Sequence, residues 1–222
     1  MYADDTSIYH SASDPSEVSN IQSWTDENNL RLNVAKTQLM ILCRKGMRQL
    51  AQQVSVFHRS ARITQHKWVK YLGVVVDENL NWDKHITKVR QKCFTNLALI
   101  RRACSYLPTA VKKSLYNALV LPHLDYCSVV WNSCNQGLST SLQRVQNLAA
   151  RIILNKPPRT HSEPLRKLLD WTTLATRRDI QTVCYVYRCL TGQAPSYLQS
   201  KFIINEEFGY QNTRGKRKLH LT

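Results

Sequence analysis

The sequence lacks an apolar run long enough to cross a membrane. A membrane-spanning helix needs about 20 mostly apolar residues, and the longest apolar stretch, residues 115–131, is interrupted by Asn117, Pro122, His123 and Asp125. The sequence begins Met-Tyr-Ala-Asp-Asp and so also lacks the basic and apolar leader of a secreted protein. We therefore expect an intracellular protein, nuclear or cytoplasmic, without a membrane span.

The seven cysteines lack the spacing of a disulfide framework or a zinc site. Their number is odd and no two are separated by two residues, which favours reduced thiols. His123, Cys127 and Cys134 match no common zinc-ligand spacing. Cys184 and Cys189 are five residues apart on an expected helix, where they do not share a face. We interpret the cysteines as buried small hydrophobic residues.

Residues 1–30 lack lysine and arginine altogether. This stretch holds six acids, and all 31 basic residues follow it against nine acids, for a formal net charge of +16. An acidic end joined to a basic body suits a protein that follows a nucleic acid towards a catalytic cation. Two alternatives stay open, a basic protein without a special partner and a protein that binds anionic membrane surfaces.

Two adjacent carboxylates, Asp4 and Asp5, lie between residues 2–3 and the run 6–9. The pattern predicts a strand, a tight turn and a second strand, with both acids at the tip. Side chains alternate along a strand, but at a tip both acids can reach one cation. Mg²⁺ prefers such oxygen ligands. The alternative is an acidic surface turn, since Asp is common in turns.

Several stretches resemble the palm of non-LTR (LINE-like) retrotransposon reverse transcriptases, in the order of that family. Residues 2–6, Tyr-Ala-Asp-Asp-Thr, resemble the metal-binding hairpin called motif C. Residues 30–37, Leu-Arg-Leu-Asn-Val-Ala-Lys-Thr, resemble motif D, and residues 70–77, Lys-Tyr-Leu-Gly-Val-Val-Val-Asp, resemble motif E, the primer grip. Residues 121–132 resemble the segment that follows the palm, so the resemblance covers most of the chain.

The resemblance implies an RNA-directed DNA polymerase that uses two Mg²⁺ ions for nucleotidyl transfer on an RNA template and a DNA primer. It gives Asp4 and Asp5 the role of catalytic metal ligands. It places Lys36 near the triphosphate, where a cation can stabilise or protonate the leaving pyrophosphate; the alternative is a solvated surface lysine. The residues that it implies for substrate and primer contact are Tyr2, Asn33, Tyr71, Leu72 and Gly73.

The family's fingers and its motif A strand, with a third metal-binding Asp, lie upstream of motif C. The sequence begins at motif C, and neither Asp77 nor Asp83 is expected to replace the missing ligand. We therefore expect a polymerase fragment that is inactive alone. Two alternatives stay open: a non-enzymatic nucleic-acid-binding remnant, and a relic without function. The oligomeric state, the template and the insertion target stay open too.

The first 80 residues predict a helix and several short strands. Val18, Ile21 and Trp24 form one stripe of a helix over 16–29. Strands are expected over residues 38–43, 54–57, 63–67 and 68–76, with a polar connector over 44–53. The last strand is rich in aromatic and β-branched residues, and Gly73 marks a bulge or a close backbone approach in it.

The rest of the chain predicts mostly helices. Apolar residues at three- and four-residue steps predict a helix over 83–104, with a basic opposite face. Further helices are expected from Pro108 to Pro122 and over 138–154, 163–169 and 174–190, with a strand or buried turn over 125–135. The residues expected to face inward are Val111, Leu115, Ala118 and Leu119 in the second helix, Leu142, Val145, Leu148 and Ile152 in the third, and Ile180, Val183, Tyr187 and Leu190 in the last.

The fold expected is α+β, a truncated palm with a small antiparallel sheet followed by a mostly helical, thumb-like region. We expect a partial palm over 1–80, a thumb-like region over 81–155, and a helical extension over 156–222 with a basic tail at 214–218, the joint lying near 155–161. The resemblance to a polymerase thumb implies contact with the nucleic-acid backbone. The cations expected to make it, on outward helix faces, are Lys112, Lys113, Arg144 and Arg151.

Overall fold

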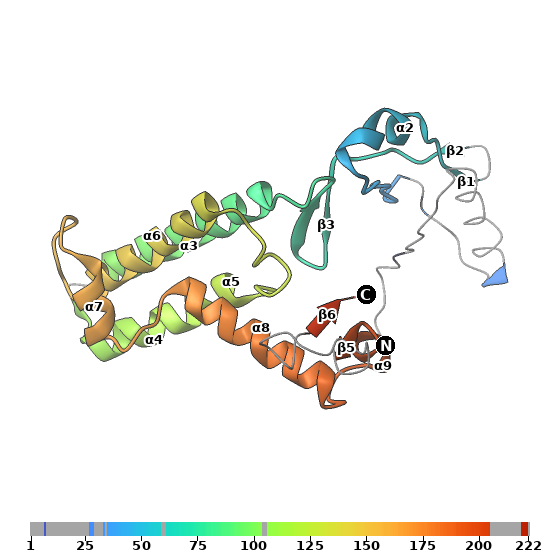
Figure 1. Ribbon diagram of the computed structural model, residues 1–222. Coiled ribbons are helices and arrows are strands. Elements are labelled where there is room, and N and C mark those ends of the chain that lie inside the picture. The colour runs from blue at the N-terminus through green and yellow to red at the C-terminus, as the bar shows by residue number, and fades with distance from the viewer. Residues whose placement is uncertain are drawn as a thin grey trace. The chain divides into compact units, whose positions relative to one another are not determined.

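The computed structural model describes residues 7, 27–28, 33, 35–58, 61–103, 106–204 and 219–221. The chain divides into two compact units, Met1–Lys84 and His85–Thr222, with an α+β fold (Figure 1). Motif C and most of the helix predicted over 16–29 lie outside the described residues, as does the basic tail.

The first unit contains short antiparallel strands and one short helix. β1 (Phe57–His58) pairs with β2 (Ala61–Arg62), and β3 (Trp68–Tyr71) pairs with β4 (Val74–Asp77). The 3₁₀-helix η2 (Lys45–Met47) continues into α2 (Arg48–Gln53). The prediction of a connector over 44–53 was wrong there, because Arg, Gln, Leu and Ala are good helix formers. The predicted strand over 38–43 is reduced to one bridge between Leu39 and Gln65.

The segment predicted as a single strand over 68–76 is a hairpin. Leu72 and Gly73 have φ values of 44° and 86°, so they form a two-residue turn between β3 and β4. Two consecutive positive φ values match the twist of flanking strands in tight hairpins. The predicted bulge at Gly73 is therefore the second residue of a turn, and the strands predicted over 54–57 and 63–67 are likewise replaced by the shorter β1 and β2.

The second unit is helical, and its elements match most of the helices predicted. They are α3 (Asp83–Ala103, which begins two residues before the unit), α4 (Thr109–Leu119), α5 (Leu121–Asp125), α6 (Gln136–Ile153), α7 (Ser162–Leu168), α8 (Leu174–Leu190) and α9 (Ser196–Gln199). β5 (Phe202–Ile204) pairs with β6 (Leu219–Leu221). Residues 155–161, predicted as a joint, lie inside this unit.

The predicted stripe of α3 is confirmed, since Ile86, Val89, Cys93, Leu97 and Ile100 are buried. By contrast, Pro122 does not end a helix. It occupies the first turn of the short α5, where its missing N–H is not needed. Turns follow α5 over residues 126–134 and enclose the fully buried Trp131, which agrees with a buried turn and excludes a strand there.

The inward face of α4 was predicted wrongly. Val111 is 41% exposed, whereas Lys112 is 1% exposed and shares the buried face with Tyr116 and Val120. Ala118 and Leu119 are also exposed. Lysine can bury its methylene stem like an apolar residue, so a pattern that counts every lysine as outward is shifted here by one position.

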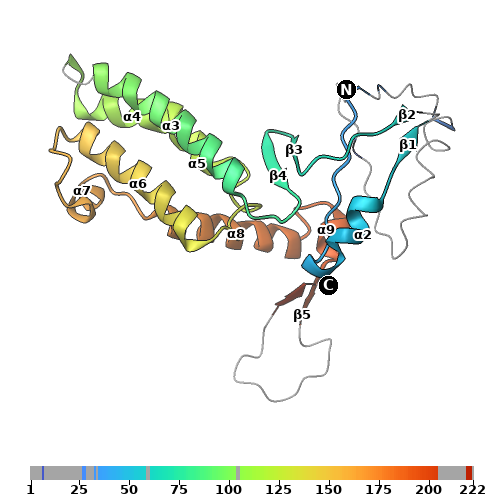
Figure 2. The same ribbon diagram turned by 90° about the horizontal axis from the view of Figure 1, so that it is seen from above.

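The buried faces of α6 and α8 also differ from the predicted ones. In α6, Leu142 and Val145 are buried as predicted, but Ala149 and Ile153 are buried in place of Leu148 and Ile152. In α8 the predicted apolar stripe is turned outward: Ile180, Val183 and Tyr187 are 53%, 67% and 61% exposed. In both views the C-terminal half of α8 extends beyond the end of α6 (Figures 1 and 2).

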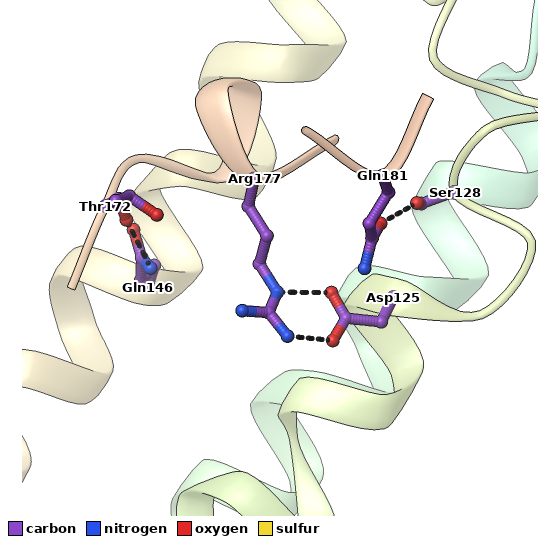
Figure 3. Close-up of polar contacts among 6 residues, drawn as sticks. All are labelled: Asp125, Ser128, Gln146, Thr172, Arg177 and Gln181. Atoms are coloured by element: carbon purple, nitrogen blue, oxygen red, sulfur yellow. Dashed lines mark hydrogen bonds and ion pairs between the residues drawn. The ribbon is translucent and has the colours of Figure 1, made fainter. Parts of the chain in front are cut away.

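Part of the inward face of α8 is polar and joins a network of hydrogen bonds, beside the buried Leu174 and Cys189 (Figure 3). Arg177 donates from Nε and Nη2 to the two carboxylate oxygens of Asp125, both at 2.7 Å. Ser128 donates to Gln181, and Gln146 of α6 donates to the backbone oxygen of Thr172 at 3.1 Å. These bonds lock α8 against α6 and the segment after α5, which explains why apolar residues are left outside.

The neighbouring arginine of α8 is buried and supports the same packing. Arg178 is 4% exposed, donates to Asn132 at 3.0 Å and to Ser139 at 2.7 Å, and lies over the ring of Trp131. A buried charge is tolerated when its donors are paired in this way. The second unit therefore uses cations as internal structural groups.

Candidate nucleic-acid interface

The predicted metal ligands Asp4 and Asp5, and the neighbouring Tyr2, lie outside the described residues. Asn33 and Lys36 are described and lie in one tight turn. The backbone oxygen of Asn33 accepts hydrogen bonds from the backbone N–H groups of Lys36 and Thr37, both at 3.0 Å, and from the Thr37 hydroxyl at 2.9 Å. The turn presents the side chain of Lys36 to solvent.

The three residues predicted from motif E form the tip of the β3–β4 hairpin. Tyr71 and Leu72 are 48% and 59% exposed, and Gly73 is exposed beside them. The Tyr71 hydroxyl lies 2.9 Å from the hydroxyl of Ser7, at hydrogen-bonding distance. Ser7 follows Asp5 by two residues in the sequence. The structure therefore places Ser7 beside the tip of the motif E hairpin.

Three of the four cations predicted to contact a nucleic-acid backbone bind within the protein instead. Lys112 Nζ donates to Asn155 Oδ1 at 3.0 Å, and Lys113 Nζ donates to the backbone oxygen of Leu169 at 2.8 Å. Arg151 Nε donates to the backbone oxygen of Thr160 at 2.9 Å. The predicted outward position of Lys112 was wrong, as described for α4.

Arg144, the fourth, is exposed on α6. Contact of Lys113, Arg144 and Arg151 with a nucleic-acid backbone stays a prediction.

α3 carries several exposed cations. Lys88, Lys92, Arg101 and Arg102 are exposed on the face opposite its buried stripe, while Arg90 is half-buried and lies over Phe94. Lys88 and Lys92 are four residues apart and hence neighbours on the helix surface. The basic face predicted for this helix is confirmed for these exposed residues.

Two histidines that the sequence did not single out as electrostatic groups lie beside these lysines. The pKa of His85 is lowered by burial and then by the charges of Lys92 and Lys88. The pKa of His123 is lowered by burial and by the charge of Lys92. A lysine that disfavours protonation of two histidines marks a region of positive potential, and such regions attract polyanions.

The cysteines confirm only part of their predicted role. Cys93 and Cys189 are buried, and burial raises the pKa of Cys93 to about 12, so its thiol stays protonated. Cys184 is exposed, which corrects the expectation of burial, although Cys184 and Cys189 do lie on different faces as predicted. Over the described ranges, no cluster of three or more His, Cys, Asp or Glu residues could hold a metal ion.

Within the described part of the chain, none of the helices is both long enough and apolar enough to cross a bilayer.

Comparison with known proteins finds relatives among the polymerases of mobile elements of Drosophila melanogaster. The chain is 24% identical over 133 residues to the probable RNA-directed DNA polymerase from transposon X-element, covering 59% of this chain and 14% of the relative. It is 21% identical over 184 residues to the corresponding protein of transposon BS, and 27% identical over 164 residues to the RNA-directed DNA polymerase from mobile element jockey. These two matches cover 78% and 72% of this chain.

The chain therefore spans 14–20% of the length of the curated relatives that it matches. No protein-family model and no solved structure matches it. The resemblance that motifs C, D and E predicted is confirmed by these relatives: the chain is similar in sequence to the RNA-directed DNA polymerases of non-LTR retrotransposons.

Proposed function

We propose that the chain is the palm-to-thumb part of a retrotransposon reverse transcriptase, with a partial palm over residues 1–80, a thumb-like region over 81–155 and an extension over 156–222. The observation that carries the proposal is the contact between Ser7 and Tyr71. Ser7 follows Asp5 by two residues in the sequence, and a chain spans at most about 3.6 Å per residue. We therefore propose that the hairpin tip and the metal ligands serve the same primer end.

Each described residue suits the role proposed for it. Tyr71 and Leu72 are exposed at a tip whose turn fixes their backbone, which suits contact with a primer strand. Lys36 is exposed on a turn held by Asn33, which suits a cation that stabilises the negative charge of a leaving pyrophosphate. Asp4 and Asp5 would hold Mg²⁺, since paired carboxylates match its preference for oxygen ligands. When bound, Mg²⁺ lowers the pKa of the primer hydroxyl and braces the phosphoryl group.

We further propose that these 222 residues do not polymerise DNA by themselves. The carboxylate at the end of motif E is engaged within its own loop: Asp77 accepts hydrogen bonds from the backbone N–H groups of Asn79, Asn81 and Trp82. It is therefore unsuited to complete a metal site with Asp4 and Asp5. We propose that the third ligand belongs to a motif A strand that this chain does not carry.

The test compares primer extension with binding. We expect the purified chain to bind an RNA–DNA duplex without extending it in Mg²⁺, and Asp4→Asn with Asp5→Asn to leave that binding unchanged. In a polymerase that carries the chain together with a motif A strand, the same two substitutions should abolish extension. Robust extension by the 222 residues alone would refute the proposal of inactivity, and unaltered extension by the double variant would refute the metal role.

A second candidate function is non-enzymatic binding of nucleic acid, which the exposed cations of α3 favour. Lys88, Lys92, Arg101 and Arg102 can contact phosphates without contributing any chemistry. Lys88→Glu with Lys92→Glu should weaken duplex binding and reduce its salt dependence. Glu163→Lys on α7 changes charge in the opposite direction at an exposed site and serves as a control. Unchanged binding in the α3 variant would remove this face from the interface.

A further inference from the structure

A hollow of about 700 Å³ lies in the first unit, between the segment before α2 and the loop after β4. Its volume falls within the range of about 300–1,000 Å³ typical of ligand sites. Two guanidinium groups line it, those of Arg44 and Arg48, together with the side chains of Asn79 and Asn81. None of these residues belongs to motifs C, D or E as the resemblance defines them.

The wall formed by the loop after β4 is fixed by one carboxylate. Asp77 Oδ1 accepts from the backbone N–H groups of Asn79 at 2.9 Å and Asn81 at 3.3 Å, and Oδ2 accepts from Trp82 at 3.1 Å. Leu80 and Trp82 have φ values of 54° and 66°, in the left-handed region that bulky residues rarely adopt. The three hydrogen bonds offset the cost of these conformations and hold the wall in one shape.

The opposite wall carries the positive charge. Arg44 and Arg48 are both exposed, so their guanidinium groups are available to a ligand at the mouth of the hollow. Arg48 donates to the Asn79 side chain and is thereby directed across the hollow towards the fixed loop. Arginine offers a planar fork of donors that matches the oxygens of a phosphate group.

The charge balance of the hollow selects an anion. One carboxylate, that of Glu78, lines it beside the two guanidinium groups, so its described lining has a net charge of +1. Leu42 and Leu80 add exposed apolar surface at its sides, 50% and 46% exposed. A site that combines a cationic fork, amide groups and apolar walls suits a phosphate that carries a sugar and a base.

We infer that this hollow binds a backbone phosphate of the nucleic-acid strand, through Arg44 and Arg48. The inference rests on the proposed function, since a polymerase fragment supplies the reason for a strand to pass the first unit. The phosphate contact inferred here lies beside the loop that follows β4. The competing ligand for this hollow is inorganic pyrophosphate, which offers phosphate oxygens without a nucleic-acid strand.

The test is the salt dependence of RNA–DNA duplex binding by the full 222-residue chain. Each lost phosphate contact lowers the slope of log K against log salt by about 0.9, so Arg44→Gln with Arg48→Gln, which removes the contact with one phosphate, should lower it by about 0.9. Arg62→Gln is the matched control, because Arg62 is exposed on β2 in the same unit and does not line the hollow. Glu78→Gln should tighten binding, since it removes the opposing charge.

The outcomes separate this inference from the proposed function. If the wild-type chain binds duplex and the arginine double variant keeps the full slope, the inference is overturned and the proposed function stands. If the wild-type chain binds no duplex, while calorimetry shows pyrophosphate binding that the double variant loses, the proposed function fails and the hollow is a site for free phosphate. A circular dichroism melt checks folding, and exposed substitutions of this kind should change stability by no more than about 0.5 kcal/mol.

Discussion

Lys112 offers the sharpest test of how this chain uses its cations. The sequence places it on the outward face of a basic helix, but the structure buries all except 1% of it on the inward face of α4. Its Nζ donates to Asn155 Oδ1 at 3.0 Å. Substitution should therefore change the free energy of unfolding and leave nucleic-acid binding alone.

The magnitude follows from the buried stem. Lys112→Ala removes three methylene groups, worth about 0.8 kcal/mol each, and leaves a cavity, so we expect a loss of about 3 kcal/mol in the free energy of unfolding. Lys112→Met keeps most of the apolar stem, with sulfur in place of the Cδ methylene, and removes the ammonium. Its cost should stay below about 1.5 kcal/mol, as for other volume-conserving changes.

Urea unfolding followed by circular dichroism measures these differences as shifts of the midpoint at constant slope. Arg144→Ala is the control, because Arg144 is exposed and its loss should cost no more than about 0.5 kcal/mol. Duplex binding by Lys112→Met should equal that of the wild type. A folded Lys112→Met variant with lost binding would refute the reasoning, and so would a Lys112→Ala variant as stable as Arg144→Ala.

Three further predictions concern stability. Tyr116→Phe should be neutral or stabilising in a thermal melt, because the buried Tyr116 hydroxyl has no hydrogen-bond partner among the residues that the structure describes; a loss above about 1 kcal/mol would contradict this. Burial holds the pKa of His85 below the ordinary value of about 6.5, so the unfolded chain binds a proton that the folded chain excludes. The stabilisation from the neutral, buried His85 is complete above a pH of about 6.5 and is lost as the pH falls below it. His85→Gln should flatten this pH dependence of the free energy of unfolding, whereas the exposed His161→Gln should not. Val183→Ala should cost no more than about 0.5 kcal/mol and Val145→Ala about 2 kcal/mol, because Val183 is 67% exposed and Val145 is fully buried; equal costs would mean that the outer face of α8 is packed.

The helices of the second unit were largely predictable, because their apolar residues recur at helical spacing. α3 is the clearest example, since its five apolar positions are interrupted by no proline or glycine. The buried faces of α4 and α8 were not predictable. In α4, Lys112 buries its methylene stem, and in α8, Arg178 is buried with its guanidinium group hydrogen-bonded to Asn132. Which cation finds an internal acceptor depends on residues more than 40 positions away in the sequence.

The candidate site was also predictable only in part. The motifs identified Tyr71, Leu72 and Gly73 and joined them to a polymerase family, but a run of β-branched and aromatic residues hid the turn at Leu72. The contact between Ser7 and Tyr71 spans 64 positions and carries no local signal. The hollow beside Arg48 was missed for another reason, since α2 is too short for its periodicity to be read.

These internal contacts also bear on how strongly the chain can bind nucleic acid. A net charge of +16 counts every cation equally, yet only a cation that reaches a phosphate releases counterions and contributes to the salt slope. Lys112, Lys113, Arg151 and Arg178 instead bind acceptors within the second unit. The salt slope of duplex binding should therefore be smaller than the net charge suggests, and the exposed cations of α3 and the hollow beside Arg48 should each contribute to it.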